Sequence, residues 1–361
     1  MQTDAHDLMQ QAVRTGCFPG AVLLVANAQK IVHFKAYGWA NLFDRTRMTR
    51  HTVFDLASLT KPLATTMAFL ELARLGIVDP KQSLASIIPA FRDTEKAAIK
   101  IQDLLRHTAG LPAWRPYFRI LATTSPVSRP SILKRLLIQE RLIKSPGAAV
   151  VYSDLGFMIL AWIVETVTDL PLGQFVSQEV YRSLDLEKKF YFPSLSAIPD
   201  DIPCAATELC PWRGVLINRV VHDDNGYTTD RLQGHAGLFG SAMPIFELLS
   251  AFLQAYRQPS ESRLSHRWAR FFATRQGRSG QALGFDVPSG HPSASGRYFS
   301  AETIGHLGFT GVSFWMDLNR SVIVILCTNR AHPSRHNNQI RAFRPRLHDA
   351  AMESLGYSAT F

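Results

Sequence analysis

Strand-like patterns at the two ends of the chain, far apart in the sequence, constrain the fold most. Near the N-terminus a buried strand is predicted at 21–26 and an alternating strand at 31–38, joined by a turn at 27–30. Near the C-terminus, 311–317 and 321–328 form a second predicted hairpin. The most economical arrangement places both ends in one antiparallel sheet. We therefore predict an α+β fold: an antiparallel sheet from both chain ends, flanked by helices, plus an all-helical insertion.

Helical patterns account for most of the remaining chain. One predicted helix begins near Ser58 and ends at Gly76, where a glycine favours a stop. The other segments with helical patterns are 5–16, 83–90, 101–107, 129–143, 154–168, 171–183, 244–257, 262–275 and 338–355. Residues 188–240 are rich in Pro, Asp, Asn and Gly and are predicted to be mainly loop. These patterns predict a discontinuous α/β part, 1–61 with 280–361, and a mainly helical part, 62–279.

Length and charge exclude several functional classes. A chain of 361 residues has ample core for one large domain or two interleaved ones. The net charge is +10 and the pI is near 9.6. The basic residues are scattered, except for a modest cluster made of Arg335, Arg341, Arg344 and Arg346. We therefore predict a solvated basic surface and no nucleic-acid partner. No run of eighteen apolar residues exists, so no membrane span is predicted.

The N-terminus and the cysteines bear on cellular location. Residues 1–7 are polar and lack the basic and apolar regions of a secretory signal. We expect a cytoplasmic protein, or a periplasmic one if a leader has been removed. Cys204 and Cys210 are six residues apart and leave a bridge or a metal open, but no Cys or His partner stands at zinc-site spacing. Reduced thiols, no metal and no cofactor are predicted.

The segment Leu56–Lys61 holds the first motif with chemical meaning, Ser58-x-x-Lys61. Residues three apart share a helix face, so the Ser58 hydroxyl and the Lys61 amine can converge. A helix N-terminus also favours developing negative charge. Lysine helps as a base only if burial or a neighbouring cation lowers its pKa. The alternative is an N-cap serine followed by a solvated lysine.

Two later segments supply possible partners for this motif. Tyr152–Asp154 stands at the head of an apolar helix, where a phenol beside a lysine ammonium can shuttle a proton; the alternative is a helix cap with a packed tyrosine. His306–Gly308 leads into the late strand, where Gly308 permits close approach of a ligand to the backbone. The N–H of Phe309 can then serve as an oxyanion donor beside the Ser58 N–H. The alternative is a strand-entry turn.

In this order and spacing, the three motifs resemble the serine beta-lactamase and penicillin-binding-protein superfamily. The resemblance is greatest to the class C-like branch of esterases, D-aminopeptidases and DD-peptidases. Phe54–Lys61 and Leu104–Pro112 resemble motif contexts of that branch, and 221–226 with 234–239 resembles one bacterial subgroup. The resemblance covers about residues 8–350. It implies a beta-lactamase/transpeptidase-like fold.

The resemblance also implies roles for single residues. Ser58 is expected to be the nucleophile that forms an acyl-enzyme, while Lys61 and Tyr152 share general-base and general-acid duty. The amides of Ser58 and Phe309 are expected to form the oxyanion hole. The residues expected to contact substrate are Asp154, His306, Gly308, Phe309, Asn338 and Arg341, the last two through a substrate carboxylate.

Two departures from the superfamily pattern shape the functional prediction. Tyr-x-Asn becomes Tyr152-x-Asp154, and Lys-Thr-Gly becomes His306-Leu307-Gly308. Both weaken the case for an efficient beta-lactamase. We predict a serine hydrolase acting through an acyl-enzyme on a small ester, amide or peptide substrate. The alternatives are a penicillin-binding DD-peptidase or beta-lactamase, and a catalytically silent penicillin-recognising or scaffold protein. The sequence predicts no oligomeric state.

Other polar and aromatic residues carry less specific signals. The loop residues His222, Asp223, Asp224 and His235 could bind a metal, but histidines hydrogen-bonded within a loop near the site are the preferred interpretation. His107 is interpreted as structural. The tryptophans Trp114, Trp212 and Trp315 line the pocket or fill the core, and the sequence leaves both open.

Overall fold

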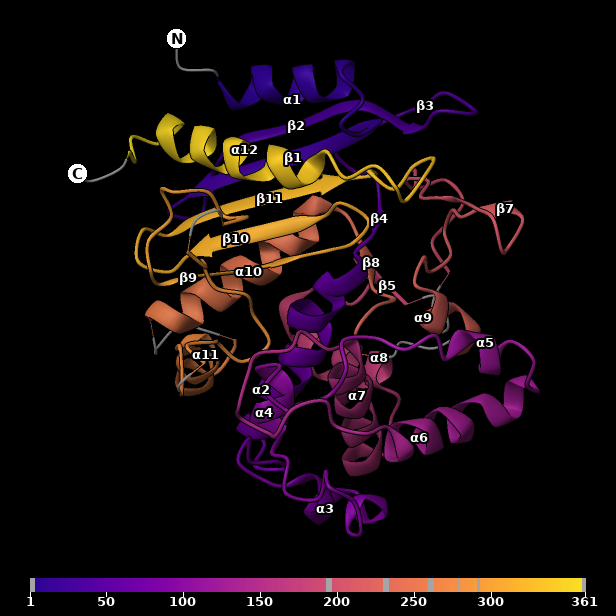
Figure 1. Cartoon of the computed structure of the whole chain (residues 1–361). Coiled ribbons are helices and arrows are strands. Elements are labelled where there is room, and N and C mark those ends of the chain that lie inside the picture. The colour runs from indigo at the N-terminus through magenta and orange to yellow at the C-terminus, as the bar shows by residue number, and fades with distance from the viewer. Residues whose placement is uncertain are drawn as a thin grey trace.

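The computed structural model describes residues 4–192, 197–229, 234–258, 263–277, 279–290 and 293–358. Its centre is a six-stranded antiparallel sheet in the order β3-β2-β1-β11-β10-β9 (Figure 1). The first three strands of the chain are β1 (Gly20–Asn27), β2 (Lys30–Asn41) and β3 (Thr46–Arg47). The last three are β9 (Thr303–Leu307), β10 (Ser313–Asp317) and β11 (Val322–Thr328). The two chain ends meet where β1 pairs with β11, which confirms the predicted α+β fold.

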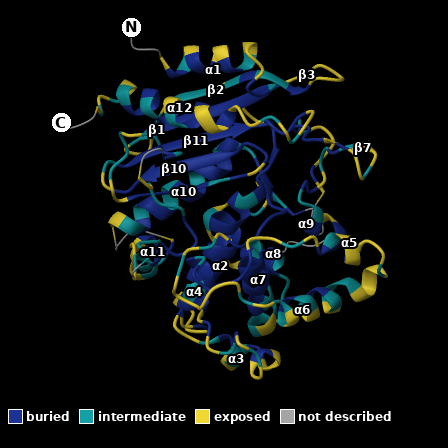
Figure 2. Ribbon diagram, in the orientation of Figure 1, coloured by how far each residue is buried: buried dark blue, intermediate teal, exposed yellow. Residues whose placement is uncertain are grey.

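Alternate side chains of the central strands pack on opposite faces of the sheet. Val22 and Leu24 belong to the core that includes α10 (Ala242–Arg257). Leu23 and Val25 pack with α1 (Ala5–Arg14) and α12 (Ile340–Ser354) on the other face. Figure 1 shows α1 above the sheet, α12 in front of β1 and β2, and α10 below β10, and Figure 2 shows β10 and β11 as buried. Burial on both faces explains why these strands are continuous apolar runs.

The helical region lies beside the lower face of the sheet and is organised around two buried helices. They are α2 (Met67–Arg74) and α7 (Asp154–Thr168), the latter capped by Ser153, whose Oγ accepts from the Gly156 N–H at 3.3 Å. The shorter helices around them are α3 (Leu84–Ile87), α4 (Ile101–Leu105), α5 (Phe118–Leu121), α6 (Arg129–Gln139) and α8 (Leu172–Phe175). Because α7 is apolar on nearly every side, it fills the centre of this region.

The loop-rich stretch after α8 contains two very small sheets. In the first, β8 (Phe239–Gly240) lies between β4 (Phe54–Asp55) and β5 (Phe190–Tyr191). The second is the hairpin of β6 (Leu209–Cys210) and β7 (Val215–Leu216). The remaining helices are α9 (Asp224–Thr229) and α11 (His266–Ala273). The predicted helix at 262–275 is thus shorter than expected, and residue 262 lies outside the described residues.

The predicted helix from Ser58 to Gly76 is correct in extent but not in type. A 3₁₀ turn (Ala57–Leu59) and a π-helix (Lys61–Thr66) precede α2. Pro62 has no N–H to donate, and the Thr60 hydroxyl donates to the Ala57 carbonyl at 2.6 Å, so a regular α-helical ladder does not start here. Gly76 follows the helix with φ +72°, as its predicted stop requires. π-Helical turns are frequent at functional sites.

A second difference concerns the segment before the late hairpin, for which a strand-entry turn was the alternative interpretation. His306 lies inside β9, opposite Phe314, so the hairpin has a third strand. Gly305 interrupts the apolar alternation there, which hid the strand in the sequence. The predicted helix at 171–183 is also broken: a π-helix (Val176–Tyr181) and a 3₁₀ turn (Arg182–Leu184) follow α8.

The four cysteines are free and buried. Among the described residues no single helix is long and apolar enough to cross a membrane. The bent pair of helical segments 154–168 and 172–184 meets the length and composition criteria for a span, and only those criteria. The division into 1–61 with 280–361 and 62–279 stays a prediction. Within it, α10 packs on the sheet although its sequence falls in the helical part.

Candidate active site

Ser58 is held at the start of the 3₁₀ turn by a buried carboxylate. Asp55 is 2% exposed and accepts the Ala57 N–H at 2.8 Å and the His222 N–H at 2.7 Å. The Asp55 carbonyl accepts the Thr310 hydroxyl at 2.8 Å. Ala57 has φ +45°, a left-handed conformation that costs a non-glycine residue energy and persists only when neighbours enforce it. Asp55 therefore ties the Ser58 turn to two loops that border it.

Lys61 lies directly behind Ser58 and is completely buried. Its Nζ donates to the Ser58 Oγ at 3.0 Å, to Asp154 Oδ1 at 2.7 Å and to the His235 carbonyl at 3.3 Å. An ammonium group has three N–H donors, and here each has an acceptor. The predicted convergence of Ser58 and Lys61 is thus present, and the alternative of a solvated lysine is wrong because Lys61 has no exposed surface.

The condition set above for a lysine base, a lowered pKa, is not met at Lys61. Burial alone lowers the pKa of Lys61, but the Asp154 carboxylate outweighs it, and the pKa is raised above its ordinary value. The carboxylate stands where the superfamily pattern has a neutral asparagine, and this adjacent negative charge stabilises the ammonium form of Lys61. At neutral pH the pair is an ammonium and a carboxylate.

Tyr152 lies next to this pair, at the surface of the cavity. Its ring centroid is 4.8 Å from Lys61 Nζ and 4.5 Å from the ring of His107, and the residue is 40% exposed. The buried part of the ring raises the pKa of Tyr152 to about 12, although Lys61 opposes the rise. Tyr152 therefore carries its proton at neutral pH. His107 Nδ1 accepts the Ser153 N–H at 3.0 Å, a structural role as expected.

The histidines of the loop near the site are paired with carboxylates. His235 Nε2 lies 2.8 Å from Asp223 Oδ1, and His222 Nε2 lies 3.1 Å from Glu208 Oε2. Burial raises the pKa of Asp223, but the His235 ring outweighs it and holds that pKa well below its usual range. Burial lowers the pKa of His235, yet Asp223 raises it overall. This arrangement supports the interpretation of hydrogen-bonded loop histidines.

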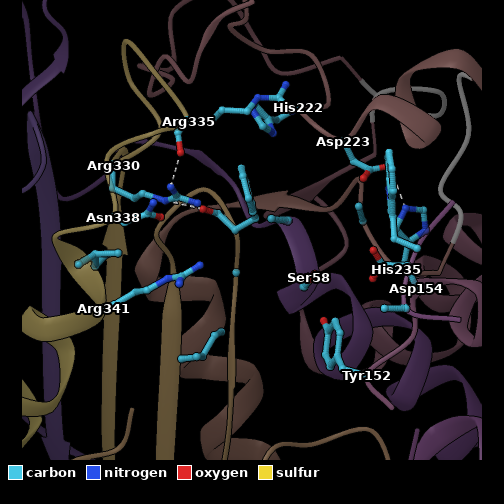
Figure 3. A pocket seen from close by; sticks show the side chains of 18 of the residues that line it. Ser58, Tyr152, Asp154, His222, Asp223, His235, Arg330, Arg335, Asn338 and Arg341 are labelled. Atoms are coloured by element: carbon cyan, nitrogen blue, oxygen red, sulfur yellow. Dashed lines mark hydrogen bonds and ion pairs between the residues drawn. The ribbon is translucent and has the colours of Figure 1, made fainter. Parts of the chain in front are cut away.

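A cavity of about 620 Å³ opens in front of Ser58. One wall, here called the catalytic wall, carries Ser58, Tyr152, Asp154, Asp223 and His235 (Figure 3). The facing wall carries Arg330, Asn338 and Arg341, with Arg335 above them. Arg344 also lines the cavity, and Arg330, Asn338, Arg341 and Arg344 are here called the arginine wall. The predicted residues Gly308 and Phe309 also line the cavity. Thus Ser58, Tyr152, Asp154, Gly308, Phe309, Asn338 and Arg341 surround a single space.

Three guanidinium groups of the arginine wall are without an ion pair to any carboxylate that the structure describes. Within the described part of the chain, Arg330, Arg341 and Arg344 form no ion pair with a carboxylate. Arg330 donates to the Phe309 carbonyl at 2.7 Å, and Arg344 donates to the Val312 carbonyl at 2.8 Å. Burial, followed by the nearby Arg330, lowers the pKa of Arg344 to about 10, so it stays charged at neutral pH. The wall presents net positive charge to the cavity.

The glycine and the amide predicted for the oxyanion site lie beside the nucleophile. A Cβ on Gly308 would overlap Val312 Cγ2 and come 3.0 Å from the Leu56 carbonyl, so this glycine lets β9 approach the Ser58 turn. Among the backbone bonds of the described residues, neither the Ser58 N–H nor the Phe309 N–H is used as a donor. Both amides are thus free to meet a substrate oxygen.

His306 occupies a different position from the one expected of a substrate contact. It is 1% exposed, its ring centroid is 5.9 Å from that of Tyr152, and it does not line the cavity. Its Nδ1 lies 2.9 Å from the Leu307 carbonyl. A supporting position beside Tyr152 fits this burial better than contact with substrate.

Sequence reasoning missed several residues of the site. Glu208 and Arg330 lay in no motif that could have identified them, and Asp55 lay in the Phe54–Lys61 motif context but was given no role of its own. The arginine cluster was visible, since Arg335, Arg341 and Arg344 all belong to it, but scattered charge gave no reason to place it in a cavity. The tryptophans divide: Trp114 lines the cavity, Trp212 is 43% exposed near its mouth, and Trp315 is buried.

Comparison with known proteins matches this chain over nearly its whole length. A sequence model of the family described as Beta-lactamase matches residues 5–344. A protein of Escherichia coli K12 named as a D-alanyl-D-alanine carboxypeptidase is 29% identical, over 90% of this chain and 81% of its own. An N-acetylmuramyl-L-alanine amidase of Bacillus subtilis 168 is 30% identical, over 87% of this chain and 78% of its own.

Solved structures share the same fold. A penicillin-binding protein homologue from Caulobacter crescentus superposes with a TM-score of 0.75 at 18% identity, covering 97% of this chain and 96% of its own. EstCE1, described as a hydrolase with promiscuous acyltransferase activity, gives a TM-score of 0.72 at 23% identity, covering 94% of this chain and 97% of its own. At these identities the likeness concerns the fold alone.

Proposed function

The chain belongs to the Beta-lactamase family, within the serine beta-lactamase and penicillin-binding-protein superfamily, and on that premise we propose that it hydrolyses esters or amides through an acyl-enzyme on Ser58. The observation that carries this proposal is the contact of one buried ammonium with a hydroxyl and a carboxylate. Lys61 Nζ lies 3.0 Å from Ser58 Oγ and 2.7 Å from Asp154 Oδ1. The class C-like branch remains the closest functional analogy for these residues.

The same contact suggests a path for the serine proton. As Ser58 Oγ bonds to the substrate carbonyl carbon, its proton passes to Lys61 Nζ, which passes one of its own protons to Asp154 Oδ1. Lys61 stays an ammonium before and after the step, and Asp154 is the final acceptor. This path accounts for a raised Lys61 pKa, because the lysine relays a proton and need not start as a free amine.

Tyr152 is suited to the opposite task. Because its pKa is raised to about 12, its phenol carries a proton at neutral pH and can donate it to the leaving oxygen or nitrogen as the carbonyl–leaving-group bond breaks. Asp154 then returns its proton through Lys61 to the phenolate, which restores the resting site. Water next attacks the acyl carbon, the bond between that carbon and Ser58 Oγ breaks, and the proton lost by water passes through the same groups to Ser58 Oγ, which restores the hydroxyl as the acid product leaves. Lys61 and Tyr152 thus share base and acid duty.

The developing oxyanion has two donors within reach. The N–H groups of Ser58 and Phe309 border the cavity, and we assign them to the oxyanion hole. Arg330 fixes the Phe309 backbone by its bond to the Phe309 carbonyl at 2.7 Å. Removing one such donor typically lowers kcat by about 10²–10³-fold, so the position of the Phe309 backbone matters for the rate.

The arginine wall indicates the charge of the substrate. Arg341 and Asn338 lie opposite Ser58, and the buried Arg344 adds a charge that no carboxylate in the described part of the chain pairs. A carboxylate on the substrate would satisfy this wall with charge-assisted hydrogen bonds. We therefore propose a carboxylate-bearing ester or amide. Within this proposal, ester hydrolysis and amide hydrolysis must be distinguished by experiment. Amide hydrolysis is worth testing because relatives are named as a carboxypeptidase and an amidase.

A panel of substrates tests the proposal. Purified protein and its Ser58→Ala variant are assayed with p-nitrophenyl acetate, a D-alanyl-D-alanine peptide and nitrocefin. We expect turnover of the ester or the peptide, slow or no turnover of nitrocefin, and no turnover by Ser58→Ala. Nitrocefin as the best substrate would favour a beta-lactamase instead. Equal activity in the Ser58→Ala variant would contradict the proposal, and absence of all turnover would favour a scaffold.

A further inference from the structure

One carboxylate that lines the cavity, that of Asp286, has no partner cation among the described residues. Four aspartates line this space. Three of them form ion pairs: Asp154 with Lys61 at 2.7 Å, Asp223 with His235 at 2.8 Å and Asp224 with Arg213 at 2.9 Å. The side chain of the fourth, Asp286, makes neither a hydrogen bond nor an ion pair within the described part of the chain. Its charge is therefore available to a ligand.

Asp286 is presented to the cavity by a fixed segment of backbone. It directly follows the buried run 282–285. Its N–H donates to the Gly305 carbonyl at 2.8 Å, and the Gly305 N–H donates to the Asp286 carbonyl at 2.9 Å. Because Gly305 belongs to β9, this pair of bonds attaches Asp286 to the edge strand of the central sheet. A carboxylate on a backbone fixed in this way is preorganised, which lowers the entropic cost of binding a partner.

Two groups within electrostatic reach of Asp286, His306 and Tyr152, do not neutralise it. Gly305 precedes His306, whose ring centroid is 5.9 Å from that of Tyr152. Burial lowers the pKa of His306, although Asp286 opposes this, so the His306 ring is neutral at neutral pH. Burial raises the pKa of Tyr152, and Asp154 followed by Asp286 add to the rise. The negative charge of Asp286 thus lies close to the proposed proton donor and is not compensated there.

A substrate that fills the cavity must supply a partner for this carboxylate. In the free protein water can solvate Asp286, but a bound substrate displaces that water. A carboxylate that loses its water without gaining a cation or hydrogen-bond donors destabilises the complex. A metal ion does not fit, because a divalent cation needs several ligands and no group of three or more potential ligands occurs among the described residues. The suitable partner is an organic cation that the substrate itself carries.

We propose that Asp286 binds a primary ammonium group of the substrate, which is then a zwitterion whose carboxylate meets the arginine wall. This inference rests on the hydrolase function proposed above, because it names a second charged group of the same substrate. A primary ammonium group offers three N–H donors to a carboxylate, whereas a quaternary one offers none. Figure 3 shows Tyr152 and Arg341 on opposite sides of Ser58. We therefore expect several bonds between the two charges of the substrate, rather than both charges on one carbon.

A series of ω-amino acids tests this assignment, because none of them contains an ester or amide that the enzyme could cleave. The series consists of glycine, 4-aminobutanoate, 6-aminohexanoate and 8-aminooctanoate, each compared with the carboxylate of the same chain length that lacks the amine. Dissociation constants are measured at pH 7 by ligand-observed NMR titration. We expect one of the longer members to bind about tenfold more tightly than its matched carboxylate, as an added charge-assisted hydrogen bond predicts, and glycine to show no such gain.

Variants of Asp286 assign the gain to its carboxylate. Asp286→Asn should bring the affinity for the zwitterion to within about twofold of that for the matched carboxylate, whereas Asp286→Glu keeps a carboxylate and should retain most of the gain. Arg341→Ala should weaken the zwitterion and the matched carboxylate alike. The matched control is Asp185→Asn, at an exposed aspartate that pairs with Arg263 and does not line the cavity, and it should bind as wild type.

The outcomes separate this inference from the proposed hydrolase. A preference for the zwitterion that Asp286→Asn removes, without turnover of any ester or amide, would support the inference and overturn the proposed function alone. Turnover with equal binding of zwitterion and carboxylate at every chain length would overturn the inference alone. A preference that persists in Asp286→Asn, or that is lost equally in Asp185→Asn, would also overturn it, as would equally tight binding of the trimethylammonium analogue.

Discussion

The two walls of the cavity handle charge in opposite ways. On the catalytic wall each charge has a partner: Lys61 with Asp154 at 2.7 Å, and His235 with Asp223 at 2.8 Å. On the arginine wall, Arg330, Arg341 and Arg344 donate to carbonyls or face the cavity, without a carboxylate in the described part of the chain. One wall is neutral as built, and the other becomes neutral only when an anion enters.

This difference separates chemistry from recognition. Paired charges keep the proton-transfer groups ready at a fixed geometry, so little reorganisation is needed when bonds change. Unpaired cations lower the free energy of unfolding, but they strengthen the binding of a complementary anion. Substitutions on the catalytic wall should therefore lower kcat, whereas substitutions on the arginine wall should mainly raise KM.

Lys61→Met should have the largest effect. The variant keeps the apolar stem but removes the group that joins Ser58 to Asp154, so we expect kcat to fall about 10³-fold with KM little changed. Steady-state kinetics on the best substrate of the panel would show this, with circular dichroism to confirm folding. The matched control is Lys134→Met on the surface of α6. A tenfold loss or less would mean that Lys61 is not the proton relay.

Asp154→Asn should act next most strongly, and mainly through pH. Removing the carboxylate leaves burial as the main influence on Lys61, so its pKa falls, but the final proton acceptor is lost. We expect kcat/KM at pH 7 to fall about 10²-fold and its acid limb to move upward by at least one pH unit, because Lys61 must now lose its proton first. An unchanged pH profile would show that Asp154 takes no proton.

Replacing Glu208 tests the ion pair of Arg335, the arginine above the arginine wall that already has a carboxylate partner. Burial raises the pKa of Glu208, but His222 and Arg335 outweigh it and lower that pKa from 4.5 to about 2. A lowered folded pKa stabilises the protein above the unfolded value, and this is lost as pH falls from about 4.5 to about 2. We expect Glu208→Gln to cost about 2–3 kcal/mol at pH 7. Thermal unfolding between pH 6 and pH 3 should then depend less on pH than in wild type; parallel curves would contradict the pairing.

Arg341→Ala should have the smallest effect of the four. Arg341 is exposed at the cavity edge, so losing one charge-assisted contact should raise KM about tenfold for a carboxylate substrate. KM for the matching uncharged amide should not change, and kcat should stay within about twofold. Arg346→Ala, from the same cluster but outside the cavity wall, is the control. A fall in kcat with constant KM would erase the distinction between the two walls.

Patterns that depend on local spacing were predictable from the sequence, and those that depend on tertiary pairing were not. Ser58 and Lys61 are three residues apart, so the helical period alone brought them together. The joining of β1 and β11 followed from apolar runs at both ends. The charge state of Lys61 required knowing that Asp154, far along the chain, points at it. The strand that contains His306, β9, was not recognised because Gly305 interrupts its apolar alternation.

The arginine wall shows the same limit. Arg330, Arg341 and Arg344 come from the end of β11 and from α12, and only the packing of α12 on the sheet directs them to one cavity. Scattered basic residues therefore looked like a solvated surface. The roles of Asn338 and Arg341 toward a carboxylate stay predictions, now with a position that permits them.

The central claim is that Ser58 is a nucleophile activated through Lys61. Intact-protein mass spectrometry after incubation with a fluorophosphonate tests it most directly, with wild type, Ser58→Ala and Lys61→Met compared at pH 7. The account predicts one adduct on wild type, mapped to the peptide that contains Ser58, none on Ser58→Ala and a strongly slowed reaction of Lys61→Met. An adduct on another residue, or equal labelling of all three proteins, would contradict it.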